Sequence, residues 1–201
     1  MTKIAVDAVL LPSREVATAA IEANRELLKQ CPRRIVLDKE GCLPHISLAM
    51  GCIDSGNIAN IAGILRKLAE TRPPGPLINA GIRVGTNSAG EKVSVLGLEK
   101  TETLQLLHEE VMHELEPYFG HDVTAEMVLS PPAAGESTLC WIRDYPRKSS
   151  FERFLPHITL GYGQLDDFSL PSEFTARSLA LCHLGNHCTC RKLLTSAEFS
   201  E

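Results

Sequence analysis

The chain has no excess of basic residues. Its 201 residues include 20 lysines and arginines against 25 aspartates and glutamates, a formal net charge of −5. Because neutralisation of phosphates supplies most of the affinity for long nucleic acids, this charge argues against a protein that grips a long duplex. Any nucleic-acid substrate is therefore expected to be a small nucleotide or an RNA terminus, held locally.

The sequence also lacks a long apolar run. No stretch is long enough to span a bilayer. The first eleven residues, which include Lys3 and Asp7, are too short an apolar run for a signal peptide. Low-complexity segments and linkers are absent as well. We therefore expect a cytoplasmic monomer without a membrane partner, folded as one domain over residues 1–201.

Cysteine, in contrast, is plentiful. Without a secretory signal, the seven cysteines are expected to be reduced thiols, several of them buried. A two-residue turn at residues 185–186 would pair His183 with Cys188 and Leu181 with Cys190. His183, Cys188 and Cys190 would then share one face and could hold zinc. Their spacing matches no standard zinc knuckle, so a structural cluster is favoured and no metal or other cofactor is assigned.

Hydrophobic periodicity and turn residues predict a mixture of helices and strands. Helices are expected over residues 16–28, from a cap at Asp54 or Ser55 to residue 70, and over residues 101–116. Strands are expected at 3–11, 34–37, 45–50, 77–84, 92–98, 139–142 and 157–162, with a C-terminal hairpin over 175–197. A polar, basic loop or short helix is expected over 143–152. Because many strands are joined by hairpin-like turns such as 85–90, we predict an α+β fold with antiparallel sheets.

One nine-residue motif occurs twice. Leu43 to Gly51 reads LPHISLAMG and Leu155 to Gly163 reads LPHITLGYG, with six of nine positions identical. A single His-x-Ser/Thr-apolar tetrad is weak evidence, whereas the extended pair is far less probable by chance. The two histidines, His45 and His157, are 112 residues apart, too far for a solenoid repeat. The spacing favours a duplicated unit with one copy in each half.

The motif has a direct interpretation on a strand. Residues i and i+2 share a face, so His45 and Ser47 point one way while the apolar residues between and after them anchor the strand in the core. His157 and Thr159 repeat the arrangement. If the two strands lie side by side around a pseudo-twofold axis, two imidazoles and two hydroxyls converge on one cleft.

That set of groups suits phosphodiester chemistry. One histidine can deprotonate a nucleophile and the other can protonate the departing alkoxide, because an imidazole changes charge near neutral pH. The hydroxyls of Ser47 and Thr159 can donate to the phosphate oxygens, and no metal is required. The alternative is that both histidines are structural. The two motifs are so similar that the sequence does not say which histidine is the acid and which the base.

The paired motifs resemble the 2H phosphoesterase superfamily, which includes the bacterial 2′-5′ RNA ligase (LigT-like) proteins and the plant and yeast cyclic phosphodiesterases. The resemblance implies two pseudo-twofold-related lobes whose antiparallel sheets form a central cleft, with helices outside. It implies metal-independent action on 2′,3′-cyclic phosphates, 2′-5′ linkages or ADP-ribose cyclic phosphate. By position, His45 and His157 would be the acid/base pair, and Ser47 and Thr159 would bind phosphate.

The sequence departs from this family directly after the second motif. Several relatives have a basic residue there, whereas this chain has Gly161-Tyr162-Gly163. Cations for the substrate could come from Arg153 or from the neighbouring basic residues Arg143, Arg147 and Lys148, although a solvated loop is the simpler interpretation.

Aromatic side chains and the remaining histidines complete the candidates. Tyr162 is placed to stack on a base, whereas core packing is favoured for Trp141 and Phe151. His108 and His113 are expected to face solvent. Two other functions remain open: a module of the same fold that binds a nucleotide or RNA end without turnover, and a metal protein centred on the cysteine and histidine cluster of the C-terminal hairpin.

Overall fold

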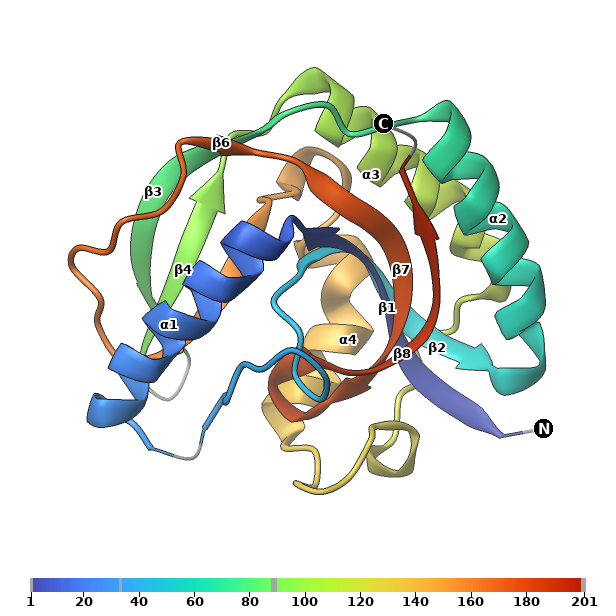
Figure 1. The fold of residues 1–201 in the computed structure, drawn as a ribbon. Helices are drawn as coiled ribbons and strands as arrows, with labels where there is room; N and C mark the ends of the chain where they lie inside the picture. Colours follow the sequence, from blue (N-terminus) through green and yellow to red (C-terminus); the bar gives the residue numbers. More distant parts are fainter. Residues whose placement is uncertain (1, 33, 88–89, 200–201) are drawn as a thin grey trace.

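Within residues 2–32, 34–87 and 90–199, which the computed structural model describes, eight strands form one antiparallel sheet (Figure 1). The spatial order is β6-β3-β4-β5-β2-β1-β7-β8. The strands are β1 (Lys3–Pro12), β2 (Ile46–Asp54), β3 (Leu77–Thr86), β4 (Lys92–Leu98), β5 (His157–Tyr162), β6 (Glu173–Phe174), β7 (Ala176–Gly185) and β8 (Thr189–Glu198). The predicted α+β class with antiparallel pairing is confirmed.

The sheet divides into two halves at its centre. β2 and β5, which carry the repeated motif, are joined through the single pair Ile46 and Ile158. Outward from them lie β1, β7 and β8 on one side and β4, β3 and β6 on the other. The two motif strands therefore hold equivalent inner positions in two four-stranded halves. This agrees with the expected pseudo-twofold arrangement of two halves.

Three helices cover the outer face of the curved sheet. They are α1 (Arg14–Gln30), α2 (Ile58–Thr71) and α3 (Glu102–Leu115). Their buried faces include Leu27, Leu65 and Leu107, which share a core with Ile46 and Ile158. Each fully buried leucine of this kind contributes about 1.5–3 kcal/mol through removal of apolar surface from water. No helix within the described residues is long and apolar enough to cross a bilayer.

The fourth helix, α4 (Glu136–Lys148), lies on the inner face of the sheet (Figure 1). Its Ile142 and Tyr145 pack with Ala5 and Met50, which point away from the outer core. The strand predicted at 139–142 is therefore wrong, because this short apolar run is one turn of α4. The buried positions 138, 142 and 145 follow helical spacing.

The strand predicted at 34–37 is also wrong. These residues run without strand pairing, although Ile35 and Leu37 are buried. The Asn24 side chain of α1 replaces a neighbouring strand, since it donates to the Ile35 carbonyl at 3.0 Å and accepts from the Leu37 amide at 2.9 Å. In the predicted 85–90 loop, residues 88 and 89 lie outside the described residues, while β3 and β4 pair up to Thr86 and Lys92.

The C-terminal hairpin forms, but its turn and pairing differ from the prediction. Asn186–Cys188 make a short 3-10 turn, and bulges shift the register so that His183 pairs with Lys192. Cys182 and Cys190 form a disulfide. The expectation that every cysteine is a reduced thiol is therefore wrong for this pair.

Candidate active site

The pairing of the two motif strands places their polar residues on one face. Ile46 and Ile158 oppose each other and both point into the outer core. Their neighbours His45, Ser47, His157 and Thr159 therefore point to the inner face, where all four are partly exposed while the alternating apolar residues are buried. His45 and His157 are diagonal neighbours across the pair, for which a separation of about 7–8 Å, and somewhat less between Cβ atoms, is typical.

Each histidine is oriented by its own main chain. His45 Nδ1 lies 2.8 Å from the Leu43 carbonyl, and His157 Nδ1 lies 2.8 Å from the Leu155 carbonyl. A carbonyl only accepts, so both Nδ1 atoms carry the proton that they donate. The Nε2 atoms are left to gain or lose a proton. The Leu-Pro-His repeat thus produces the same tautomer twice.

Both imidazoles sit in surroundings that disfavour their charged form. Burial lowers the pKa of His45 below its ordinary value, and the nearby His157 lowers it further, against the opposing effect of the Leu43 hydrogen bond. Burial also lowers the pKa of His157, and the Arg83 guanidinium acts in the same direction. The effect of His157 on the pKa of His45 indicates that the two rings are close to each other.

A carboxyl group lies beside the first motif. Asp7 of β1 is completely buried, and its Oδ2 accepts a hydrogen bond from Ser47 Oγ at 2.6 Å. The same Oδ2 is 3.9 Å from His45 Nε2. Burial raises the pKa of Asp7 well above its usual range. Sequence reasoning missed this residue, although one aspartate within the apolar run KIAVDAVLL was a signal.

A cation lies beside the second motif. On β4, Gly97 pairs with His157, and a Cβ at Gly97 would lie 2.9 Å from Arg83 Nε. The Arg83 side chain of β3 therefore crosses over Gly97 toward His157. Nothing in the sequence distinguished Arg83 from other strand arginines, because its approach depends on the pairing of three strands.

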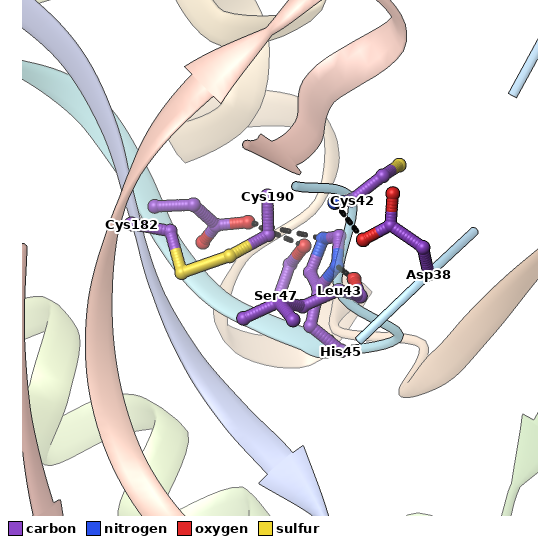
Figure 2. The surroundings of a disulfide bond; sticks show 8 residues. Asp38, Cys42, Leu43, His45, Ser47, Cys182 and Cys190 are labelled. Carbon is purple, nitrogen blue, oxygen red and sulfur yellow. Dashed lines mark hydrogen bonds and ion pairs between the residues drawn. A yellow bond between two sulfur atoms is a disulfide. The ribbon is translucent and has the colours of Figure 1, made fainter. Parts of the chain in front are cut away.

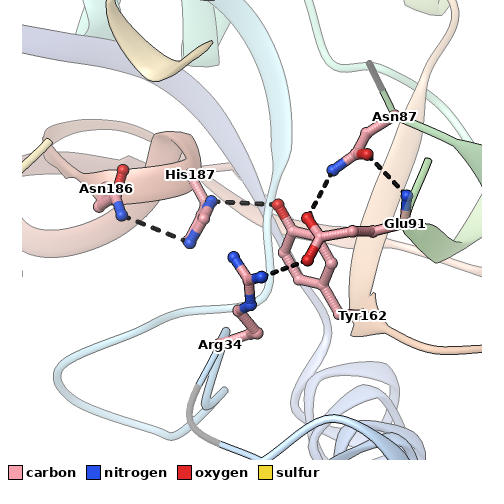
Figure 3. Close-up of polar contacts among 6 residues, drawn as sticks. All are labelled: Arg34, Asn87, Glu91, Tyr162, Asn186 and His187. Atoms are coloured by element: carbon pink, nitrogen blue, oxygen red, sulfur yellow. Dashed lines mark hydrogen bonds and ion pairs between the residues drawn. The ribbon is translucent and has the colours of Figure 1, made fainter. Parts of the chain in front are cut away.

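A bulge brings Tyr162 to the same face as the histidines. On β4, Val95 pairs with Thr159 and Val93 with Tyr162, so Leu160 is the additional residue. The Tyr162 hydroxyl lies 3.1 Å from His187 Nδ1, and the Arg34 guanidinium lies 5.2 Å from the centre of the Tyr162 ring. Figure 3 shows these side chains gathered around the tyrosine.

Further polar contacts fix this cluster. Arg34 is paired with Glu91, and Asn87 donates to the same carboxylate at 3.0 Å. His187 has the left-handed backbone angle φ of 60°, which few side chains adopt without support. Its amide donates to Thr138 Oγ1 of α4 at 2.9 Å. The cluster therefore holds Tyr162 in one orientation at the edge of the inner face.

Comparison with known proteins tests the fold. No protein-family model matches the chain, and no curated protein matches either. A solved structure described as a phosphoesterase aligns with a TM-score of 0.59 at 13% identity, covering all of both chains. Escherichia coli LigT in its apo form aligns with a TM-score of 0.56 at 12% identity, again over all of both chains. This chain has the LigT-like fold. At such identities the likeness concerns the fold alone, and the expected fold is confirmed.

The other predicted cations of this LigT-like chain are engaged elsewhere. Arg147 and Lys148 both pair with Asp144 on the exposed side of α4. The guanidinium of Arg153 donates to the carbonyl of Arg147, and Arg143 contacts Cys140 Sγ. The fold thus brings Arg83, rather than these residues, next to a motif histidine.

The LigT-like chain has a disulfide close to the first motif (Figure 2). The Leu43 amide donates to the Cys190 carbonyl at 2.9 Å, and the Leu43 carbonyl in turn orients His45. Because Cys190 is bonded to Cys182 and His183 Nε2 donates to the Met127 carbonyl, the metal site considered at the hairpin is wrong. Within the described residues, no group of three His, Cys, Asp or Glu side chains could hold a metal ion.

Two aromatic predictions for the LigT-like chain also need correction. His108 does not face solvent but is completely buried, and its ring stacks on Phe154 with centroids 4.0 Å apart. Trp141, for which core packing was favoured, is about half exposed at 48%. His113 is exposed as expected.

Proposed function

We propose that the chain is a metal-independent phosphodiesterase that hydrolyses a 2′,3′-cyclic phosphate or 2′-5′ phosphodiester at the end of an RNA or on a small nucleotide. The observation that carries this proposal is the pair of histidines on adjoining strands. Each presents Nε2 on the same partly exposed face, with its tautomer set by a main-chain carbonyl. Two such groups supply the acid and the base that phosphodiester hydrolysis needs.

The reaction requires two proton transfers. One Nε2 removes a proton from water as the water oxygen bonds to phosphorus. The bond from phosphorus to the ribose oxygen breaks, its electron pair stays on that oxygen, and the other Nε2 protonates it. The products are a phosphomonoester and a free hydroxyl. Each proton transfer contributes on the order of 10²- to 10⁴-fold to the rate.

The surrounding groups suit a nucleotide phosphate. The hydroxyls of Ser47 and Thr159 can donate to its non-bridging oxygens, and Arg83 supplies the positive charge that the second motif lacks. Tyr162 offers an aromatic face for the base, beyond Thr159 on the same face. Arg153 remains a candidate for contact with more distant parts of the substrate. The fold shared with LigT supports this class of chemistry by analogy.

The direct test is turnover of nucleoside 2′,3′-cyclic phosphates and of a 2′-5′-linked dinucleotide with EDTA present. We expect the wild-type protein to release product, and His45→Ala and His157→Ala each to lose at least about 10²-fold in kcat/KM. His113→Ala removes an exposed histidine outside the site and should retain the wild-type rate.

Two results would contradict the proposal. Equal rates for the wild type and both motif variants would show that the histidines do no chemistry. Calorimetry that detects nucleotide binding, combined with no product from any substrate, would instead support a binding module of the same fold.

A further inference from the structure

A pocket lies beside the first motif, between the first turns of α1, residues 38–44 and the adjoining ends of β1 and β7. Its volume is about 290 Å³. Small-molecule sites usually have about 300–1,000 Å³, so this pocket has room for a small group or part of a larger ligand. Leu43 and Pro44 form part of its wall, and His45 follows Pro44 directly. The pocket therefore begins one residue away from a motif histidine.

Two walls of the pocket continue into the candidate active site. Leu11 lies in the apolar cluster that contains the disulfide, and Leu43 packs against that cluster. The carbonyl of Leu43 orients His45, and the two residues lie next to each other (Figure 2). On the other side, Ile21 of α1 belongs to the cluster against which Tyr162 packs. The pocket is therefore a neighbour of both the first histidine and the tyrosine.

The charged side chains around the pocket are mostly basic. Arg14 of α1, Lys39 and Arg177 of β7 line it, and all three are exposed. Within the described residues none of them forms an ion pair. One carboxyl, Asp38, also lines the pocket, but its Oδ1 accepts from the main-chain amides of residues 40–42. A chain with a net charge of −5 thus gathers positive charge at this pocket, where an anion is stabilised.

We propose that this pocket binds a second phosphate of the substrate, which is carried on the 5′ oxygen of the ribose whose cyclic phosphate meets the two histidines. This inference rests on the proposed function and deepens it, because it defines the substrate as a nucleotide with phosphate on both sides of one ribose. The end of an RNA chain has this arrangement. A nucleoside 2′,3′-cyclic phosphate with a free 5′-hydroxyl does not.

The chemistry of the pocket favours phosphate over other anions. A guanidinium group matches two phosphate oxygens at once, and a lysine adds a compact charge. Arg14 is the first residue of α1, where the unpaired amides of the helix also favour negative charge. The apolar wall of Leu11, Ile21 and Leu43 suits the carbon atoms of the sugar that joins the two phosphates. Phosphate and sugar together therefore fit the pocket better than a small inorganic anion.

The first test compares kcat/KM for adenosine 2′,3′-cyclic phosphate with and without a 5′-phosphate. Charge-assisted hydrogen bonds to the second phosphate should make the wild type prefer the 5′-phosphorylated substrate by about ten- to hundredfold. The double variant Arg14→Gln/Arg177→Gln should lose most of this preference. The readout is the ratio of the two values, so a general loss of activity in the variant does not change it. Arg25→Gln, which removes an exposed arginine of α1 outside the pocket, should keep the wild-type ratio.

Asp38→Asn provides a variant with the opposite effect. It removes the carboxylate from the pocket, but its amide oxygen can still accept from the main-chain amides of residues 40–42. We expect the preference for the 5′-phosphorylated substrate to increase. In the wild type the preference should decrease as salt is raised from about 50 mM to about 500 mM, because exposed charges are screened. A preference that responds neither to Asp38→Asn nor to salt would overturn the role of the basic side chains.

A third substrate separates the two sources of such a phosphate. In the dinucleotide adenylyl-adenosine with a terminal 2′,3′-cyclic phosphate, the 5′-phosphate is a diester, as in RNA. A rate at least equal to that of the 5′-phosphorylated mononucleotide would identify an RNA end as the substrate. A preference for the mononucleotide alone would identify a small nucleotide, and the second-phosphate site would stand in both cases. Equal kcat/KM for all three substrates would overturn the inference.

Calorimetry tests the pocket without turnover. The wild type should bind adenosine 3′,5′-bisphosphate at least about tenfold more tightly than adenosine 3′-phosphate, and Arg14→Gln/Arg177→Gln should bind the two with similar affinity. Equal affinities in the wild type would overturn the inference while cleavage of cyclic phosphates leaves the phosphodiesterase intact. A wild-type protein that prefers the bisphosphate but cleaves no substrate would contradict the phosphodiesterase and support the pocket as a phosphate site.

Discussion

His108 shows how a single residue can hold the site in place without taking part in it. Its Nδ1 donates to the Leu48 carbonyl at 2.8 Å, and its Nε2 accepts from the Phe151 amide at 2.8 Å. Leu48 lies one residue beyond Ser47, and Phe151 lies in the segment that leads to the second motif. One neutral ring on α3 thus connects the first motif itself to the segment that leads to the second.

This arrangement predicts an acid-sensitive stability. Burial lowers the pKa of His108 to about 4, below the value of about 6.5 expected in the unfolded chain. The folded state therefore binds fewer protons between these values, so the contribution of His108 is fully present above pH 6.5 and is lost as the pH falls toward 4. At pH 5 the contribution of His108 to the free energy of unfolding has fallen by about 2 kcal/mol.

Urea unfolding of His108→Gln at pH 7 and pH 5 measures this contribution. The amide of glutamine can still donate to Leu48 and accept from Phe151 but does not titrate. Between pH 7 and pH 5, the free energy of unfolding of the wild type should fall by about 2 kcal/mol more than that of His108→Gln. The exposed His113→Gln should follow the wild type, and an equal pH dependence of all three proteins would refute the assignment.

At the scale of elements, the contact between α1 and β5 explains the departure from the family motif. Gly161 has a φ of 147°, and a Cβ there would lie 2.7 Å from Asn24 Nδ2. Asn24 uses that nitrogen to donate to the Leu160 carbonyl at 2.7 Å. A long basic side chain at this position would push α1 off the strand, so the chain has glycine there and a cation approaches from β3 instead.

Gly161→Ala should therefore destabilise the protein by about 2–3 kcal/mol, from backbone strain and loss of the buried Asn24 hydrogen bonds. Gly85→Ala is the matched control, because a Cβ at Gly85 meets nothing within 4 Å. Thermal or urea unfolding of both variants gives the comparison. Equal and small effects would show that α1 can move away from β5 without cost.

The same elements show what the sequence can and cannot predict. The alternation of polar and apolar residues in the two motifs predicted which side chains share a face of the sheet, because the direction of a side chain along a strand depends on strand geometry alone. His108 could also have been assigned to the core, since it lies four residues after Leu104 and three before Val111, both buried. Asp7 and Arg83 were out of reach as neighbours of the histidines, because their positions depend on the pairing of strands far apart in the chain.

At the scale of the whole molecule, the two halves of the sheet are interlocked by the path of the chain. β1 belongs to one half, yet α1, which follows it directly, packs on β5 of the other. β7 returns to the first half and pairs with β1 after the chain has built the second. The second half is therefore covered by a helix that follows a strand of the first half, and the first half is completed by a strand that follows the second half in the chain. Neither half is expected to be stable alone.

We predict a single cooperative unfolding transition despite the two-half architecture. Trp141, the one tryptophan in the sequence, lies on α4, which packs on β2 and so reports on the first half. Far-ultraviolet circular dichroism reports on all strands and helices. Because the two motif strands pair where the halves join, the two histidines keep their relative positions only while both halves are folded. Urea transitions followed by tryptophan fluorescence and by circular dichroism should therefore coincide, and activity should be lost at the same urea concentration. A fluorescence transition at clearly lower urea than the loss of circular dichroism would show that the half carrying β2 unfolds separately.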